Sequence, residues 1–419
     1  MQQNNRERLL PVILLGCLFF LFGFVTWLNG TLIPYLKIAC ELTNFQSLFV
    51  AFAFYIAYFV TALPSAWLLK RTGLKKGMMI GLWVMAVGAI LFIPAAGTRT
   101  YGIFLTGLFI IGTGLSILQT ASNPYITIVG PIESAAKRIS IMGICNKVAG
   151  VLAPIVLGAL VLSDADTFTA SIDGVDPALR NLKLDELASR VVWPYSIMSI
   201  MLVILGIFVR YSPLPDIEAE GEQRDDPAKP AFGSVLSHPH LVLGVIALFL
   251  YVGAEVISGD TIGNYGQAQG MPLSSAKHLT SYTLAAMVIG YIIGIFSIPR
   301  FISQSKALLL SAITGIFFTI AAIVTDGTVS VMFIALLGLA NALVWPAIWP
   351  LAIAGLGRHT KTGSALLIMA IAGGALLPLL YGRLADAPSI GPQQAYWILV
   401  PCYLFILWYS VKGSRMRSW

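Results

Sequence analysis

Long apolar runs recur along this chain and limit its fold more than any other feature. A helix needs about 20 apolar residues to cross a bilayer, and the 419 residues hold twelve runs of that size. Charged residues make up 11% of the chain, against about a quarter in soluble domains. This composition excludes a soluble enzyme and predicts an all-α integral membrane protein. We expect transmembrane helices at about 9–36, 45–69, 77–97, 101–130, 138–162, 190–211, 239–265, 276–298, 305–325, 328–356, 362–383 and 393–412.

The distribution of lysine and arginine predicts how these spans are oriented. If both termini are cytoplasmic, 18 of the 26 basic residues lie in inner loops, seven lie in outer loops, and Lys147 is left within a span. The positive-inside rule therefore favours cytoplasmic termini. Topology also accounts for the net charge of +7, so we expect no nucleic-acid partner. The longest outer loop is then 163–189, where 177–190 is predicted to form a short amphipathic helix.

Six spans lie on either side of an acidic, proline-rich segment at 212–238, whose composition suits a solvated cytoplasmic linker. We therefore predict an N-terminal six-helix bundle at 1–211 and a C-terminal six-helix bundle at 239–419. Weak internal similarity supports two parallel repeats, because 119–124 (QTASNP) aligns with 341–346 (NALVWP). Two pseudo-symmetric bundles of this kind are the architecture of the major facilitator fold.

Residue patterns typical of catalysis are missing from the sequence. It has no phosphate-binding glycine loop and no Ser, His and acid set at an interpretable spacing. The four cysteines are scattered, and they form neither a metal-ligand spacing nor a disulfide framework. We therefore expect no enzyme activity.

Several short segments carry a family resemblance. Residues 70–77 (KRTGLKKG) resemble the basic loop between the second and third spans of the major facilitator superfamily, with Lys70 where that motif usually has Asp. More specific are 27–34 (WLNGTLIP), 42–46 (LTNFQ), 118–125 (LQTASNPY) and 251–255 (YVGAE). Together they resemble the fucose-galactose-glucose-hexose symporter family, nearest to its bacterial glucose/galactose transporter branch.

The resemblance implies a multi-pass transporter of the bacterial inner membrane that imports a hexose (glucose, galactose or mannose) by alternating access. We expect it to be a monomer in the lipid bilayer. Fucose-proton members of the family have an Asp directly after Leu-Asn in the first span and a Glu before Thr-Ala-x-Asn-Pro in the fourth, where these acids serve proton coupling and sugar recognition. This chain has Gly30 and Gln119 at those positions. Neither residue ionises, so the resemblance does not carry that proton relay over.

Amide side chains within the spans are candidates for sugar binding. A pyranose loses water from several hydroxyls when it is buried, and a site compensates with convergent donors and acceptors. Gln119 and Asn123 are four residues apart and share one face of a helix. Asn29 and Asn146 lie in the first and fifth spans, which border the central cavity in the resembling fold. The alternative is that these amides only join helices to one another.

The tenth span adds two further candidates. Asn341 and Trp345 are the repeat counterparts of Gln119 and Asn123. An indole stacks on the apolar face of a sugar while its N–H donates to a hydroxyl. Trp349, one turn further on, is a weaker candidate, and for both tryptophans the alternative is packing in the core or against lipid.

Lys147 is predicted about 13 Å deep in its span, near the midplane of the membrane. A charge at that depth costs roughly 2.5 to 3.5 kcal/mol on insertion scales, so it needs a counter-ion, water or substrate. Glu255 and Asp260, in the seventh span, are the acids that we place within spans. A pair between Lys147 and Glu255 would join the two halves and compete with sugar or cation binding, which suggests a gate. The alternatives are a fixed structural pair, or Asp260 in outer solvent.

Three coupling schemes are compatible with these residues. Sodium would bind near Glu255 and the backbone oxygens of the glycine-rich seventh span, a proton would titrate Glu255 or Lys147, and uniport would need no ion. We favour sodium, because the acids of the proton symporters are missing and some hexose members of the family use sodium. The rival functions are an N-acetylglucosamine or other sugar permease, an uncoupled hexose uniporter, and a transport-inactive membrane sugar sensor.

Overall fold

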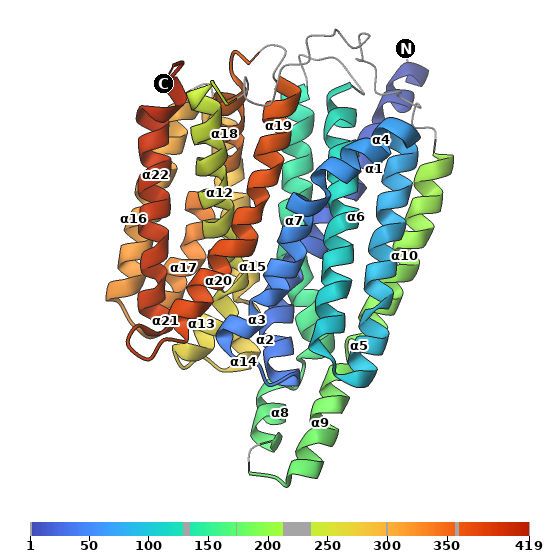
Figure 1. The fold of residues 1–419 in the computed structure, drawn as a ribbon, viewed down its shortest axis with the longest axis vertical. Helices are drawn as coiled ribbons and strands as arrows, with labels where there is room; N and C mark the ends of the chain where they lie inside the picture. Colours follow the sequence, from blue (N-terminus) through green and yellow to red (C-terminus); the bar gives the residue numbers. More distant parts are fainter. Residues whose placement is uncertain are drawn as a thin grey trace.

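The computed structural model describes residues 2–128, 135–172, 174–212, 236–298, 301–356 and 360–418. Within these residues, twelve helices or runs of consecutive helices are long and apolar enough to cross a membrane. Each overlaps one predicted span, so the twelve-span prediction is confirmed. Most of the predicted 212–238 linker lies outside the described residues. The helices stand roughly side by side, and both chain termini lie at the same end of the bundle (Figure 1).

The part of the chain before the linker, here called the N half, forms six spans. The first consists of α1 and α2, which are separated at Leu28, and the fourth, fifth and sixth are single helices. The elements are α1 (Gln2–Trp27), α2 (Asn29–Ala39), α3 (Asn44–Ser47), α4 (Phe49–Ile90), α5 (Phe92–Thr98), α6 (Tyr101–Ile128), α7 (Ala135–Val161), α8 (Ala165–Ile172), α9 (Pro177–Ser189) and α10 (Val192–Tyr211).

A glycine turn divides α4 into the second and third spans. Gly73 has φ 76° and ψ 169°, a backbone conformation that side-chain-bearing residues rarely adopt. It lies in the middle of the basic 70–77 segment. The turn explains the glycine in that segment and sends the chain back across the bundle.

The part of the chain after the linker, here called the C half, also forms six spans. Most of them are broken into two or three consecutive helices, as the seventh is at Thr261. The elements are α12 (Pro239–Asp260), α13 (Ile262–Ala268), α14 (Leu273–Ala276), α15 (Leu279–Ser297), α16 (Gln304–Val324), α17 (Gly327–Asn341), α18 (Val344–Ile353), α19 (Thr360–Met369), η3 (Ala370–Ala372), α20 (Gly373–Ala385), α21 (Gly391–Gln394), η4 (Ala395–Ile398), α22 (Leu399–Val411) and η5 (Gly413–Arg415).

Two ends of the bundle differ in shape. The end that carries both termini is here called the terminal end. At the opposite end, α8 and α9 project beyond the other helices (Figure 1). This end is called the α8/α9 end. The predicted helix at 177–190 is observed as α9, whereas α8 was not anticipated from the sequence.

Apolar side chains cover much of the outside of the bundle. On α10, Trp193 is 76% exposed and Ile200 and Ile204 are both more than half exposed. A helix with apolar residues on all sides is stable only where lipid or protein surrounds it. The halves meet where α7 contacts α15 and where α4 contacts α20. The candidate site residues described next lie near these contacts.

Candidate functional site

Lys147 and Glu255 form an ion pair between the two halves. Lys147 Nζ on α7 lies 2.8 Å from Glu255 Oε1 on α12, and the two side chains are only 11% and 12% exposed. An isolated charge is costly at this depth, and a close partner of opposite charge offsets part of that cost. The structure therefore joins the two charges that the sequence analysis placed in opposite halves.

The indole ring of Trp27 lies against the Lys147 ammonium of this pair. Lys147 Nζ is 4.7 Å from the centre of its indole ring, within range of a cation–π interaction. The ring sits between two glycines from opposite halves: a methyl group added at Gly150 or at Gly259 would fall 2.6 Å from an indole carbon. The glycines are required for this close approach, and Trp27 fills the contact between the halves at the level of the ion pair.

Two further buried polar side chains have no hydrogen-bond partner. Asp260, the last residue of α12, is fully buried, and neither of its carboxylate oxygens is bonded. Asn29 is 1% exposed, and neither end of its amide is bonded. Asp260 lies within electrostatic range of Glu255 and of Tyr55 on α4. The expectation that Asp260 could lie in outer solvent is wrong, because the helix continues past it as α13 and buries it.

Gln119 donates from Nε2 to the Tyr58 hydroxyl at 3.1 Å, and its side chain is half-buried. Among the residues that the structure describes, none donates to its carbonyl oxygen. Asn146 also is half-buried, and its Nδ2 lies 3.4 Å from the backbone oxygen of Phe19 on α1. Asn146 thus makes the helix-to-helix contact that was the alternative to sugar binding.

The candidates of the tenth span have protein partners in this conformation. Asn341 is fully buried: its Nδ2 donates to Ser258 Oγ, and its Oδ1 accepts from Tyr403. Trp345 and Trp349 stack on one another with ring centres 5.5 Å apart, and both pack against the hydrophobic core. Asn123 lies on α6, but its side chain is outside the described part of the structure.

Gly30, at the position of the family's first-span aspartate, is tightly enclosed. A methyl group added there would fall 2.3 Å from the Thr280 hydroxyl of α15. Thr280 in turn donates to the backbone oxygen of Gly259. In this conformation the position has no room for a side chain, which agrees with the absence of an acid in this chain.

Polar contacts close the interface at the α8/α9 end. Asp386, just after α20, accepts from Asn44 Nδ2 and from the Phe45 backbone N–H, each at 2.7 Å. Lys37 donates to the Oδ1 of the same asparagine. Ser47 and Asn264 form a longer contact beside them. These groups link α3 of the N half to α13 and α20 of the C half.

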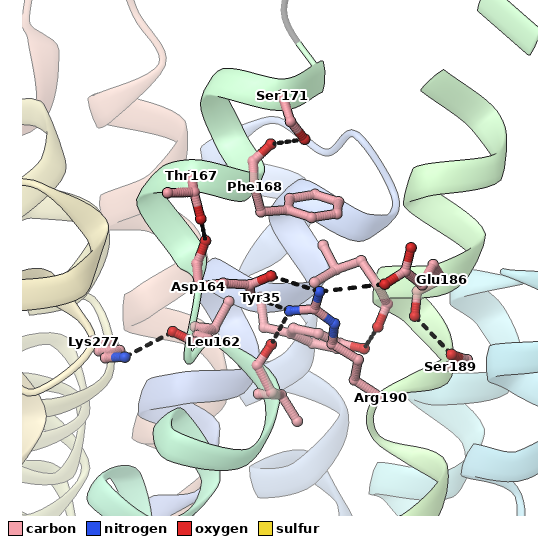
Figure 2. Close-up of polar contacts among 12 residues, drawn as sticks. Tyr35, Leu162, Asp164, Thr167, Phe168, Ser171, Glu186, Ser189, Arg190 and Lys277 are labelled. Atoms are coloured by element: carbon pink, nitrogen blue, oxygen red, sulfur yellow. Dashed lines mark hydrogen bonds and ion pairs between the residues drawn. The ribbon is translucent and has the colours of Figure 1, made fainter. Parts of the chain in front are cut away.

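A second group of contacts lies at the base of α8 and α9 (Figure 2). Lys277 of the C half donates to the backbone oxygen of Leu162 at 2.7 Å, and Asp166 accepts from the Ser274 N–H. Nearby, Arg190 forms a two-point contact with Asp164. The loop between α7 and α8 is therefore held by Lys277 of the C half and by Arg190 of the N half.

Hydrogen bonding by Arg190 lowers the pKa of the Asp164 carboxyl below its usual value. The Tyr35 hydroxyl, in the same region, donates to the backbone oxygens of Leu187 and Ala188. These contacts anchor α9 to the rest of the N half.

Hydrogen bonds join described residues of the two halves from the level of Lys147 toward the α8/α9 end. They include the bond from Ser281 Oγ to the backbone oxygen of Val151 and the bond from Lys277 to the backbone oxygen of Leu162. The structure is thus closed at the α8/α9 end.

No three His, Cys, Asp or Glu side chains gather in the described part of the chain. A cation beside Glu255 would therefore take its remaining ligands from backbone, hydroxyl or amide oxygens. Sodium accepts such ligands, whereas a proton needs only one carboxylate oxygen.

Comparison with known proteins identifies the family. The sequence model of the Major Facilitator Superfamily matches residues 15–379. The chain belongs to the major facilitator superfamily. Within this superfamily it is 37% identical over 404 residues to a glucose/galactose transporter of Brucella abortus biovar 1, covering 96% of this chain and 93% of the relative. It is 30% identical over 422 residues to the L-fucose-proton symporter of Escherichia coli K12, covering 99% and 95%.

A solved structure supports the same assignment. The crystal structure of the major facilitator superfamily transporter FucP in the outward conformation matches with a TM-score of 0.75 and 29% identity, covering 98% of this chain and all of that one. This chain is therefore a major facilitator superfamily sugar transporter with the twelve-helix fold, and not an enzyme.

Sequence reasoning did not single out Trp27, Tyr55 or Tyr58 as parts of the site. Trp27 lies in the 27–34 segment that carried the family resemblance, but nothing in its spacing indicated a position beneath Lys147. A useful signal would have been the glycines on other spans, because a large ring in a helical bundle needs small residues opposite it.

Proposed function

We propose that this chain imports a hexose, namely glucose, galactose or mannose, across the bacterial inner membrane by cation-coupled alternating access. The relatives named glucose/galactose transporters support the substrate class. In this proposal the termini are cytoplasmic, as the basic residues predict, and the α8/α9 end is the outer face. The structure then corresponds to a state closed toward the outside.

The observation that carries this proposal is the ion pair between Lys147 and Glu255. The pair depends on the conformation of the protein, because its members belong to different halves. Their 2.8 Å separation requires the halves to be in contact at this level. When the α8/α9 end opens, the pair must separate or follow one half. A polar ligand that binds both groups would replace their attraction and change the balance between the two states.

A sugar has the chemistry to act on this pair. Its hydroxyls donate to Glu255 and accept from Lys147, and hydrogen bonds to charged groups contribute about 1.5–3 kcal/mol each. Gln119 has a carbonyl oxygen that accepts from no described residue, and Asn29 has an unbonded amide. The Trp27 indole, buried between the halves in this conformation, would offer an apolar face once they separate. Asn123, Asn146, Asn341 and Trp345 remain candidate ligands for another conformation of the cycle.

The proposal includes a coupling cation. The preference for sodium gains no support from the relatives, one of which is named an L-fucose-proton symporter. The experiment therefore compares three conditions on equal terms: a sodium gradient, a proton gradient and no ion gradient.

The deciding experiment measures uptake of labelled D-glucose into proteoliposomes under an inward proton gradient, an inward sodium gradient, and no gradient. Unlabelled galactose, mannose and N-acetylglucosamine serve as competitors. Accumulation above the external concentration supports cation-coupled import, and equilibration without accumulation supports the uniporter. Inhibition by N-acetylglucosamine together with no glucose flux would replace the hexose with the acetylated sugar. Sugar binding without any exchange would indicate a sensor.

Gln119→Ala tests the binding site. Loss of its amide removes a sugar acceptor and one of the hydrogen-bond partners of the Tyr58 hydroxyl, so we expect sugar binding to be abolished while the protein still folds. Quenching of tryptophan fluorescence by sugar reports binding, and size-exclusion chromatography reports folding. Gln304→Ala, at the exposed start of α16, is the matched control. Unchanged affinity in Gln119→Ala would remove this residue from the site.

A further inference from the structure

Asp260 lies on the face of the seventh span that meets the N half. Positions 256, 259 and 260 share one side of α12, and Gly263 follows in α13, just after the break at Thr261. Gly259 abuts Trp27, and a methyl group added at Gly263 would contact Pro34. Val256 and Tyr55 both lie over Gly374. Asp260 is therefore enclosed by residues of both halves.

The surroundings of Asp260 do not stabilise a negative charge. Both of its oxygens are unbonded in a fully buried position. The charged groups within electrostatic range are Glu255 on the same helix and Lys147 on α7, and Tyr55 faces it from α4. The one cation of this set is already paired with Glu255 at 2.8 Å. Burying an unpaired carboxylate is strongly unfavourable, whereas burying a protonated carboxyl is much less so.

We propose that Asp260 is the residue that carries a coupling proton through the transport cycle. This inference rests on the proposed sugar transport and assigns its cation. When the α8/α9 end is open, the carboxylate faces outer water and takes up one proton, and in the closed arrangement the carboxyl is neutral. When water reaches it from the terminal end, the same oxygen releases that proton to the cytoplasm, so one proton enters per cycle and the step balances without a further reactant.

The position of Asp260 also predicts an order of events. It lies five residues beyond Glu255 toward the α8/α9 end, about 7.5 Å along the helix. Water that enters from the opened α8/α9 end therefore reaches Asp260 before it reaches the ion pair. The proton binds first, and the sugar then acts on Lys147 and Glu255.

The test compares the whole transporter with Asp260→Asn in proteoliposomes. Asparagine is uncharged, like the protonated aspartate, at nearly the same size. The control is Asp185→Asn, which makes the same chemical change at a residue whose side chain is 61% exposed. Three quantities are measured for D-glucose and D-galactose: counterflow exchange at equal pH, accumulation under an inward gradient of one pH unit, and proton entry during downhill sugar flux, reported by an internal pH dye.

We expect the unmodified transporter and the Asp185→Asn control to accumulate sugar up to about tenfold, the limit for one proton per sugar at one pH unit. Asp260→Asn should retain counterflow but lose both accumulation and proton entry. Accumulation by Asp260→Asn equal to that of the unmodified protein would overturn the inference, as would accumulation by the unmodified protein that requires sodium alone. Absence of any hexose exchange in the unmodified protein would instead refute the proposed function.

A binding measurement covers the case in which Asp260→Asn does not exchange sugar. Sugar affinity of the purified proteins is measured from pH 5 to 9 by tryptophan quenching. If Asp260 takes up the proton before sugar binds, the affinity of the unmodified protein falls as pH rises, and the affinity of Asp260→Asn stays constant. A pH dependence that persists in Asp260→Asn would show that another group carries the proton.

Discussion

The middle of the interface and its α8/α9 end differ in how their buried polar side chains are hydrogen-bonded. Both bring polar side chains of the two halves into contact away from water. At the α8/α9 end, Asp386 has two donors and the Lys277 ammonium has a backbone acceptor, although Asn264 Oδ1 is buried without a partner. In the middle, Lys147 and Glu255 have each other, but Asp260 and Asn29 have no partner.

This difference indicates that the two regions have different roles in the transport cycle. Satisfied polar groups stabilise one arrangement of the halves and gain little from a ligand. Unsatisfied buried groups raise the energy of the arrangement and gain much from one. The contacts at the α8/α9 end thus favour the closed state, while Asp260 and Asn29 in the middle are groups on which the proposed proton and sugar would act.

Breaking the central pair should have the largest effect. Lys147→Ala leaves Glu255 as an unpaired buried charge, and removing one partner of a buried pair costs about 3–5 kcal/mol. We expect sugar uptake to fall at least about a hundredfold. The Lys147→Ala, Glu255→Ala double variant should recover the thermal stability lost in Lys147→Ala, though not transport. Uptake by Lys147→Ala that matches the unmodified protein under every gradient would show that the pair is incidental.

Filling the space beside Trp27 should have the next largest effect. The methyl group in Gly259→Ala overlaps a rigid indole ring, and overpacking of this kind costs typically 1–3 kcal/mol. We expect the closed state to lose population. The rate at which a cysteine introduced by Ser47→Cys reacts with a thiol reagent, in a background without native cysteines, measures this loss.

The control for Gly259→Ala is Gly102→Ala, whose added methyl group has no atom within 4 Å. It should leave the labelling rate unchanged. Equal rates in Gly259→Ala and Gly102→Ala would mean that the indole moves aside without cost.

Weakening the closure at the α8/α9 end should have a smaller effect. Asp386→Asn removes the charge that accepts from Asn44 and Phe45 but keeps one oxygen acceptor, so we expect a loss of about 1 kcal/mol. Labelling of the same Ser47→Cys reporter should rise about fivefold. Asp185→Asn is again the matched control. A change in sugar affinity without a change in labelling would contradict the role of Asp386 in closure.

The smallest effect concerns pH at the base of α8 and α9. The pKa of Asp164 is lower in the folded protein than in the unfolded chain, so its pair with Arg190 contributes stability above the unfolded pKa of about 3.9. That contribution is lost as pH falls through the lower, folded pKa. We expect Asp164→Asn to reduce the melting temperature slightly at pH 6 and to match the unmodified protein at the lowest pH reached. An equal difference at every pH would exclude this linkage.

The spans were predictable because apolar length is a local property of the sequence. The helix α9 was predicted from a local amphipathic pattern, and the family followed from short motifs. Partners across the interface were not predictable in the same way. Arg383 and Asp386 are close in sequence and of opposite charge, yet Asp386 accepts from Asn44 and Phe45 in the other half. Such contacts depend on helix rotation and on the conformational state, which leave no periodic signal in one sequence.

The amide candidates show the same limit. Gln119 and Asn146 were equally plausible from sequence, because both are polar residues in apolar helices. In the structure one bonds a tyrosine hydroxyl and the other approaches a backbone oxygen of α1. Residue type established that these positions need partners, but only the arrangement of the helices determines which partners they find.

The place of Trp27 between two glycines gives the transporter an internal optical probe. Its indole lies 4.7 Å beneath the Lys147 ammonium, and the emission of an indole responds to nearby charge. Separation of the halves, loss of the ion pair or arrival of a sugar would each alter that local electric field. A variant that retains Trp27 as its one tryptophan would therefore report the conformational cycle by fluorescence, in real time and without an attached dye.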